Sequence, residues 1–383
     1  MNFYNLIQAE LENNTEDIVI VDDYGSMTAA EFLSQVDLFA KKLNSSNILP
    51  HSIISFQSPE DRSFLVTLLA ILKINAVAYP FHIQQKFTNE AIINYHLTSN
   101  WNENNEEFDL NLKCINPVVN QKISELNPAV IRPTSGTVGN SKGVCISHEQ
   151  IENRIRNANE LYQANPGEVV GWFLPMAYHF VVSLLAFLRY RATIVTIPPK
   201  LFGANLVEYL EKHKVDFTYG SPLNYHSLSI KNPNWKPRLA ISTTYGLSKK
   251  VAEEFYSAYD LPISQALGII EIGLAFGNTK ASFDNMLSIG SPLGNTEYKI
   301  DSPDSNGTGE LLLKSDGHFS AYLEPFRQYS EIAANGWFRT GDLAKANSDD
   351  TISIIGRKKN VLNVYGLKVF PEEVEEAIKS CPE

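Results

Sequence analysis

The chain has 383 residues, of which 44% are hydrophobic, 20% charged and 11% aromatic, a composition that excludes a disordered or collagen-like protein and leaves room for two or three domains. Its 43 acidic residues outnumber its 32 basic ones, and the resulting net charge of −11 disfavours nucleic acid and anionic membranes as partners. The three cysteines, Cys114, Cys145 and Cys381, are odd in number and far apart, which fits neither a disulfide framework nor a zinc site and favours a reducing compartment.

The N-terminal residues lack the basic start and apolar centre of a secretory signal. The apolar run at 181–188 ends at Arg189, well short of the roughly 18 residues that a membrane span needs. We therefore expect a cytoplasmic protein that makes no membrane contact.

The first half of the chain alternates helical and apolar patterns. Residues 28–43 place Phe32, Val36 and Phe39 on one helical face, and Thr28 and Glu31 have capping-box spacing at its start. A strand, a helix and a strand are predicted next, at 53–56, 59–74 and 76–79. Residues 99–111, rich in Asn and Glu, are expected to form a solvated connection.

From residue 129 onward, short apolar runs are again separated by helical patterns, and these runs are 129–132, 168–173, 192–197, 215–219, 238–242 and 262–266. This alternation predicts an α/β architecture with mostly parallel sheets. From about Met286 the pattern changes to short strand-like pieces separated by turn residues, at 298–301, 310–314 and 351–355. These pieces predict a β-rich subdomain.

The glycine-rich segment TSGTVGNSKG at 134–143 follows an apolar run and precedes a helix whose start is marked by Ser147 and Gln150. Its glycines allow backbone N–H groups to approach an anion, its hydroxyls add donors and its lysine adds a charge. It is not a Walker loop, because Ser141 stands at the position of the second glycine and Gly143 follows the lysine. The pattern predicts a phosphate-binding loop, and a glycine- and serine-rich surface loop is the alternative.

The segment resembles the T-S-G-T-T-G-x-P-K-G signature of the adenylate-forming superfamily, which includes acyl-CoA synthetases, aryl-acid ligases and nonribosomal peptide adenylation domains. Val138 and Ser141 depart from it. Four further segments resemble family motifs in the family's order, at 265–273, 309–323, 336–343 and 356–376. The resemblance covers nearly the whole chain. It implies an α/β core at 1–285, with two mostly parallel sheets and flanking helices, a β-rich subdomain at 286–358, and a hinge with the start of a C-terminal lobe at 359–383.

By this resemblance the chain uses ATP to convert a carboxylic acid into an acyl-adenylate, releases pyrophosphate, and passes the acyl group to the thiol of coenzyme A or of a carrier protein's phosphopantetheine. The implied catalytic residues are Lys142 and Glu271, with Glu271 also binding Mg²⁺. Asp342 would accept both ribose hydroxyls, and Lys359 would be the hinge. The implied ATP-binding residues are Thr134, Ser135, Gly136, Thr137, Gly139, Lys142, Gly143, Leu267, Gly268, Asp342 and Arg357.

The acid pocket is expected around residues 174–184, which resemble the corresponding segment of aryl-acid adenylating domains. The residues implied to line it are Tyr178, His179, Phe180, Gly220 and Tyr245. Because no aspartate is available there to hold an α-ammonium group, we expect an aryl, fatty or other non-standard acid. His179 can hydrogen-bond a hydroxyl or carbonyl, or meet a second carboxylate if it is protonated; the alternative is a histidine satisfied within its own helix.

Several residues depart from the family pattern. Leu267 and Ile270 stand where relatives have an aromatic residue and a threonine, and the bulky Tyr245 stands in a loop of small residues. Only 24 residues follow Lys359 in the 383-residue chain, fewer than the roughly 40 that usually fold unaided, so we expect low activity from this chain alone. Two alternatives stay open: a non-catalytic binding or scaffold protein on the same fold, and one lobe of a split enzyme.

Overall fold

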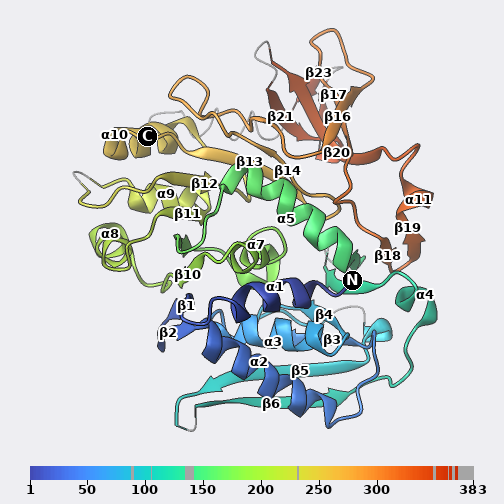
Figure 1. Ribbon diagram of the computed structural model, residues 1–383. Coiled ribbons are helices and arrows are strands. Elements are labelled where there is room, and N and C mark those ends of the chain that lie inside the picture. The colour runs from blue at the N-terminus through green and yellow to red at the C-terminus, as the bar shows by residue number, and fades with distance from the viewer. Residues whose placement is uncertain are drawn as a thin grey trace.

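The computed structural model describes residues 1–87, 90–104, 106–133, 142–230, 233–347, 351–360, 362–364 and 367–369. Two large sheets and their helices form most of the molecule, and a smaller sheet lies at the end opposite β5 and β6 (Figure 1). The predicted fold class, a large lobe with two mostly parallel sheets and a small β-rich part, is confirmed.

The first large sheet has the order β15-β14-β13-β12-β11-β9-β10-β1-β2. Its central neighbours, from β1 through β10, β9, β11 and β12 to β13, are all parallel. Antiparallel strands occur only toward its two edges. Its strands are β1 (Ile18–Asp22), β2 (Gly25–Thr28), β9 (Val169–Trp172), β10 (Thr193–Thr196), β11 (Phe217–Gly220), β12 (Leu239–Ser242), β13 (Ser264–Ile269), β14 (Gly273–Gly277) and β15 (Ser291–Pro292).

The second large sheet has the order β19-β18-β8-β7-β4-β3-β5-β6, with β5, β3, β4 and β7 parallel. Its strands are β3 (Ile53–Gln57), β4 (Val77–Pro80), β5 (Tyr95–Asn102), β6 (Glu107–Cys114), β7 (Pro128–Arg132), β8 (Val144–Ser147), β18 (Ala321–Leu323) and β19 (Phe326–Gln328). The short strand β8 follows the glycine-rich segment and pairs antiparallel to β7, so that segment connects two adjacent strands rather than a strand and a helix.

The expectation of a solvated connection at 99–111 is wrong, because β5 and β6 form an antiparallel hairpin there, from Tyr95 opposite Cys114 to Asn102 opposite Glu107. Its inner face packs through Phe108, whose ring lies 5.8 Å from that of Phe39 and 4.9 Å from that of Trp101. Alternate residues on the outer face are exposed or half-buried, as is common in antiparallel hairpins with one face toward water. The Asn and Glu residues on that face make the segment resemble a loop and obscure the alternation of buried and exposed residues that is typical of strands.

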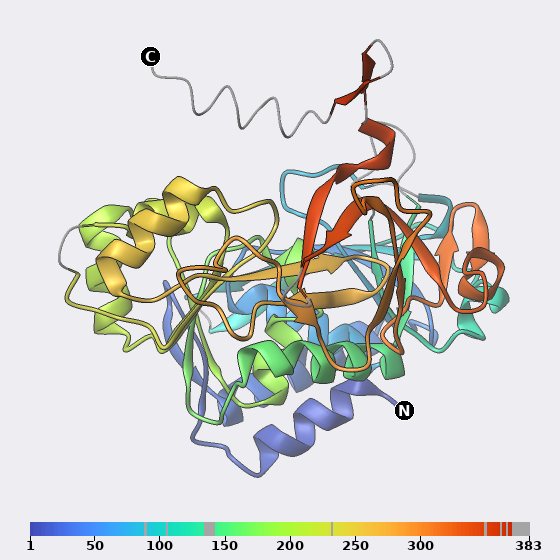
Figure 2. The ribbon, with the colours of Figure 1, turned by 90° about the horizontal axis from the view of Figure 1, so that it is seen from above.

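The β-rich part beyond residue 286 is present as a four-stranded antiparallel sheet in the order β16-β17-β20-β21 and a hairpin, β22-β23, which stands out from the body in Figure 2. The strands are β16 (Glu297–Asp301), β17 (Gly309–Lys314), β20 (Phe338–Ala346), β21 (Ile352–Arg357), β22 (Leu362–Val364) and β23 (Leu367–Val369). The intervening β18 and β19 return to the second large sheet. Residues 286–358 are therefore interleaved with the larger body.

The helices cover the sheets and join them. The capping boxes predicted at Thr28 with Glu31 and at Ser147 with Gln150 are both formed, and they begin α2 and α5. Helix α3 is buried from Arg62 to Leu72. The helices are α1 (Phe3–Glu12), α2 (Ala29–Asn44), α3 (Arg62–Lys73), α4 (Gln121–Ser124), α5 (His148–Tyr162), α6 (Met176–His179), α7 (Leu184–Arg189), α8 (Gly203–Lys212), α9 (Pro222–Leu228), α10 (Lys249–Tyr259) and α11 (Tyr329–Ile332), with the 3₁₀ turns η1 (Glu90–Ile92) and η2 (Lys358–Asn360).

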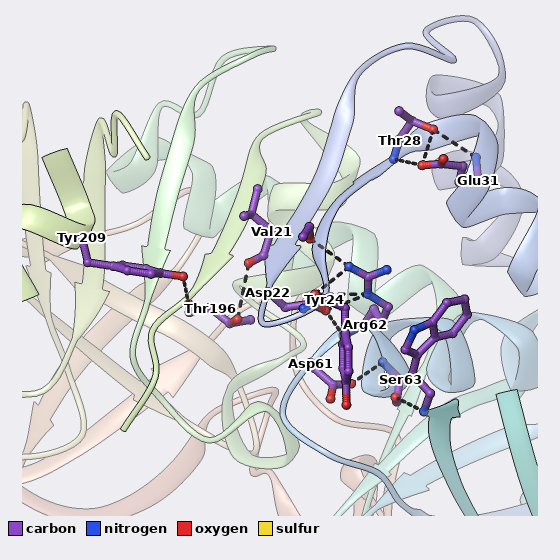
Figure 3. Close-up of polar contacts among 12 residues, drawn as sticks. Val21, Asp22, Tyr24, Thr28, Glu31, Asp61, Arg62, Ser63, Thr196 and Tyr209 are labelled. Carbon is purple, nitrogen blue, oxygen red and sulfur yellow. Dashed lines mark hydrogen bonds and ion pairs between the residues drawn. The ribbon is translucent and has the colours of Figure 1, made fainter. Parts of the chain in front are cut away.

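A buried ion pair ties α3 to the first large sheet. The Arg62 guanidinium bonds both carboxylate oxygens of Asp22, at the end of β1, with Nη2 2.6 Å from Oδ1 and Nε 2.9 Å from Oδ2 (Figure 3). It also donates to the Gly25 carbonyl at 2.8 Å and lies 5.5 Å from the centre of the Tyr24 ring.

Across the described ranges, no helix combines the length and apolarity that a membrane crossing demands.

Candidate functional site

The candidate site lies where strands of the two large sheets end. β7 ends at Arg132 in one sheet, and β11 and β13 end at Gly220 and Ile269 in the other. The carboxyl ends of parallel strands are the usual place for ligands in such sheets. The Arg132 guanidinium donates a hydrogen bond to the backbone oxygen of Tyr178, so side chains from one sheet meet the segment that follows β9 of the other.

A tyrosine brings together the two residues expected to act in catalysis. Strand β18 pairs with β8 so that Tyr322 lies opposite Val144, directly beyond the glycine-rich segment. The Tyr322 hydroxyl donates to Oε1 of Glu271 at 2.7 Å, and Nζ of Lys142 lies 4.6 Å from the centre of the Tyr322 ring. Burial first, and then the Glu271 carboxylate, raise the pKa of Tyr322 above its ordinary value. The hydroxyl therefore keeps its proton and holds the carboxylate as a donor.

The backbone that carries Glu271 is clamped by a buried arginine of α5. Arg154, 1% exposed, donates to three carbonyl oxygens: Gly317 at 2.6 Å, Ile270 at 2.9 Å and Glu271 at 3.0 Å. The N–H of Phe319 also donates to the Glu271 oxygen, at 2.8 Å. Burial lowers the pKa of Arg154 to about 9, which leaves the group charged at neutral pH. By holding the backbone of residues 270 and 271, Arg154 limits the positions that the Glu271 carboxylate can take.

A second carboxylate, Asp342, faces the site from the four-stranded sheet. It is 4% exposed, and its Oδ1 lies 2.8 Å from Nε of Arg357, directly opposite on β21. Burial raises the pKa of Asp342, Arg357 opposes this rise, and Glu271 adds to it, so the two acidic residues influence each other. Beside the pair, a cavity of about 340 Å³ is lined by Thr340, Gly341, Arg357, Lys358 and Lys359.

The segment expected to bind the acid is short helix α6 and its flanks. The Tyr178 hydroxyl donates to Oε1 of Gln85 at 3.0 Å, and the Met176 N–H donates to the Glu60 carboxylate. Burial, together with the charge of Arg132, lowers the pKa of His179 to about 3, so the imidazole is neutral at neutral pH. A neutral imidazole suits the expected hydrogen bond to a hydroxyl or carbonyl of the acid. The other option, a protonated His179 that meets a second carboxylate, stays a prediction.

The carboxylate expected to bind Mg²⁺ at this site is that of Glu271. Among the described residues, no group of three or more His, Cys, Asp and Glu side chains could hold a metal ion. Mg²⁺ commonly takes one or two protein carboxylates and completes its shell with phosphate oxygens and water. The Glu271 carboxylate beside Tyr322 suits that mode of binding, whereas the described residues offer no ligand set for a zinc site.

Comparison with known proteins places this geometry in a family. Residues 83–323 match the AMP-binding enzyme family. The chain belongs to this family. The predicted membership of the adenylate-forming superfamily is thereby confirmed.

Individual relatives of the AMP-binding enzyme family agree with this assignment. A long-chain-fatty-acid–CoA ligase of Haemophilus influenzae is 24% identical, over 68% of this chain and 50% of its own length. A malonate–CoA ligase of Arabidopsis thaliana is 27% identical, over 67% of this chain and 47% of its own. The chain spans about half the length of the curated relatives it matches. The crystal structure of ATP-bound MatB from Rhodopseudomonas palustris has the same fold, with a TM-score of 0.80, 18% identity, and coverage of 100% of this chain and 84% of MatB.

Within this member of the AMP-binding enzyme family, the predicted site residues differ in where the structure places them. Lys142 and Glu271 converge on Tyr322, and Asp342 pairs with Arg357. Gly143 is buried with a φ of 58°, and Lys359 lies in η2. The predicted phosphate-binding residues that lie outside the described residues are Thr134, Ser135, Gly136, Thr137 and Gly139.

The remaining predicted residues lie at differing depths. Leu267 is partly buried against the core, whereas Gly268 is exposed. Gly220 is buried at the end of β11. Tyr245 is 58% exposed, and its hydroxyl accepts a hydrogen bond from the N–H of Leu223 at 3.2 Å. Phe180 has no exposed surface and packs on Phe64, so it supports the pocket region from within the core.

Sequence reasoning missed Tyr322 and Arg132. Tyr322 belongs to the 309–323 segment that resembles a family motif, so a signal for it was present. Arg132 is the last residue of β7, and the apolar run that precedes it gave no indication of a function. Its pKa is lowered to about 10 by burial, while Tyr219 and Glu271 act in the opposite direction. The group therefore stays charged at neutral pH.

Proposed function

We propose that this chain binds ATP and a carboxylic acid and joins them as an acyl-adenylate. An oxygen of the acid carboxylate attacks the α-phosphorus, the bond to the bridging oxygen breaks, and pyrophosphate leaves. A thiol of coenzyme A or of a carrier protein then attacks the acyl carbon, and AMP leaves. The observation that carries the proposal is the convergence of Lys142 and Glu271 on Tyr322, directly beyond the glycine-rich segment.

The residues of this cluster suit attack at phosphorus, where catalysis consists mainly of positioning and charge neutralisation. Lys142 would neutralise phosphate charge. Glu271, held by the Tyr322 hydroxyl at 2.7 Å, would bind Mg²⁺, which polarises phosphate oxygens when it is bound. Because the carboxylate already accepts one hydrogen bond, its orientation is set before the ligand arrives.

The Asp342 carboxylate suits the ribose, because a buried carboxylate accepts hydrogen bonds from two neighbouring hydroxyls. Oδ1 of Asp342 already lies 2.8 Å from Nε of Arg357. To bind the ribose, Asp342 must share its carboxylate between Arg357 and the hydroxyls, or Arg357 must shift toward the nucleotide. The side chain of Arg357 is 49% exposed and therefore has room to move.

On the acid side, the neutral His179 and the absence of a carboxylate at its position favour a substrate without an α-ammonium group. We infer an aryl, fatty or other non-standard acid. The relatives named above act on acids as different as long-chain fatty acids and malonate, so their activities do not narrow the choice of acid. The thiol acceptor, coenzyme A or a carrier protein, is to be determined by supplying each to the adenylating protein.

The test is the acid-dependent exchange of labelled pyrophosphate into ATP, with MgCl₂ and a panel of carboxylic acids. We expect exchange with some acids and loss of it in Glu271→Gln. Tyr322→Phe should lower the rate about tenfold to a hundredfold, the usual value of a hydrogen bond to a charged group. Glu297→Gln, which removes a carboxylate that pairs with Lys314 on the surface, is the matched control and should leave exchange unchanged.

The non-catalytic alternative is favoured by Leu267 and Ile270 and by the engagement of Asp342 with Arg357. Calorimetry with ATP and MgCl₂ separates the two functions. Binding that Asp342→Ala abolishes, together with exchange, supports adenylation. Absence of both ATP binding and exchange would overturn the proposal and favour a scaffold.

A further inference from the structure

Among the described residues, the arginines Arg62 and Arg154 are buried, and Arg132 is half-buried with an Nε atom that is buried and poorly satisfied. Arg62 bonds both oxygens of Asp22 and the Gly25 carbonyl (Figure 3). Arg154 donates to three backbone carbonyls. Among the described residues, Arg132 makes one hydrogen bond, to the Tyr178 oxygen, and its buried Nε has no partner.

An unsatisfied guanidinium is costly, because a buried donor without a partner loses its hydration and gains nothing in return. Within the described ranges, no acidic side chain forms an ion pair with Arg132. Glu271 influences it electrostatically, but the Glu271 carboxylate is held by Tyr322. The described part of the chain therefore holds a partly buried positive charge at Arg132 and supplies no ion-pair partner for it.

The surroundings of Arg132 are those expected for the acid. Its guanidinium carbon lies 5.9 Å from the centre of the Phe180 ring, and its charge acts on His179 and Tyr219. These aromatic and neutral groups provide no anion. A planar guanidinium whose Nε–H has no partner among the described residues matches a carboxylate, to which a guanidinium can donate two parallel hydrogen bonds.

We propose that Arg132 binds a second carboxylate of the acid substrate, so that the preferred substrates are dicarboxylic acids. This inference rests on the proposed function and narrows it to a substrate class. Arg132 acts as a specificity residue and takes no part in bond making.

Arg132 is assigned to the second carboxylate of the acid, and not to the carboxylate that reacts, because only the second one keeps its negative charge during the reaction. When the reacting carboxylate joins AMP, it becomes a mixed anhydride and loses its negative charge. A guanidinium that paired with it would be left buried and unpaired once more. A second carboxylate keeps its charge in the free acid, in the adenylate and in the thioester, so it satisfies Arg132 at every stage.

The experiment compares pyrophosphate exchange by the full chain with matched acids: succinate against butyrate, glutarate against valerate, and phthalate against benzoate. We expect kcat/KM for at least one diacid to exceed that for its monoacid by about 100-fold, a common value for a buried charge pair. Arg132→Met should abolish this preference, mainly through KM, and should leave the rate with monoacids unchanged or higher. Arg132→Lys keeps the positive charge but cannot donate two parallel hydrogen bonds to one carboxylate, so it should retain part of the preference.

Two controls keep the result interpretable. Arg156→Met removes an arginine that pairs with Asp316 on the surface and should alter neither ratio. Thermal unfolding should show that Arg132→Met is no less stable than the original protein, because the variant loses an unsatisfied buried group. A lower melting temperature with equal loss of both acid classes would assign Arg132 a structural role and overturn the inference.

The remaining outcomes are also decisive. Equal loss of diacid and monoacid exchange in a stable Arg132→Met protein would mean that Arg132 contacts a group common to all substrates, which overturns the inference while the proposed function stands. If no acid supports exchange, the proposed function fails, and calorimetry with glutarate still tests Arg132. Glutarate binding that Arg132→Met abolishes supports the inference, and no binding overturns it.

Discussion

Glu60 should make the stability of this protein depend on pH in an unusual direction. It precedes α3 and accepts a hydrogen bond from the Met176 N–H at the start of α6, and burial raises its pKa from 4.5 to about 7. A carboxyl whose pKa is higher in the folded state holds its proton more tightly there. Between pH 4.5 and about 7 the unfolded chain has released this proton and the folded chain has not, so stability falls as the pH rises.

The magnitude follows from the two pKa values. Their difference, 4.5 against about 7, corresponds to an upper limit of about 3 kcal/mol at 1.36 kcal/mol for each pH unit. In Glu60→Gln the amide oxygen still accepts the Met176 N–H, but no charge has to be buried. The variant should therefore equal the original protein below pH 4.5 and exceed its unfolding free energy by about 2 to 3 kcal/mol above pH 7.

Urea unfolding of both proteins at pH 4.5 and pH 8 measures this difference, and subtracting one protein from the other cancels the titration of all shared groups. Glu253→Gln, on the exposed surface of α10, is the control and should shift stability equally little at both pH values. A Glu60→Gln effect that is the same at pH 4.5 and pH 8 would refute the reasoning, because it would show that the carboxyl does not change its charge within this window.

Two further perturbations test the packing around the sheets. Asp22→Asn should cost about 3 to 5 kcal/mol of unfolding free energy, because it leaves the buried Arg62 charge without its partner, and a loss below 1 kcal/mol in urea unfolding would contradict this. Gly273→Ala should be more destabilising than Gly25→Ala. Both glycines have positive φ, of 101° and 94°, but a Cβ at 273 would lie 2.9 Å from Cγ of Arg154, whereas at 25 it would meet nothing within 4 Å. Equal melting temperatures for the two variants would refute the steric argument.

Much of the fold could be predicted because its strands and helices carry local signals. The parallel strands of the first sheet are short apolar runs, and α2 and α5 begin at capping boxes that the residue spacing alone indicates. The hairpin of β5 and β6 could not be predicted in this way, since its outer face is exposed at the edge of a sheet and its polar residues resemble those of a loop. Edge position is a property of the tertiary structure.

In the candidate site, too, local residue patterns could be predicted from the sequence, whereas tertiary contacts could not. The motifs that contain Lys142, Glu271 and Asp342 are visible as residue patterns, whereas the contacts that orient them depend on strand pairing between distant segments. Arg132 illustrates the limit most clearly. Nothing in the residues beside it distinguishes it from a charged residue at the end of a strand, and only the lack of a partner in the folded protein singles it out.

The pairing of β18 with β8 also has a consequence for synthesis on the ribosome. The four residues of β8 are all buried, and they emerge more than 170 residues before Ala321, the first residue of the strand that covers their edge. Until then, a nascent chain presents an unpaired apolar edge, of the kind that promotes association between chains. We expect nascent fragments that end before residue 320 to require chaperone protection, and those that extend past Gln328 to lose that requirement.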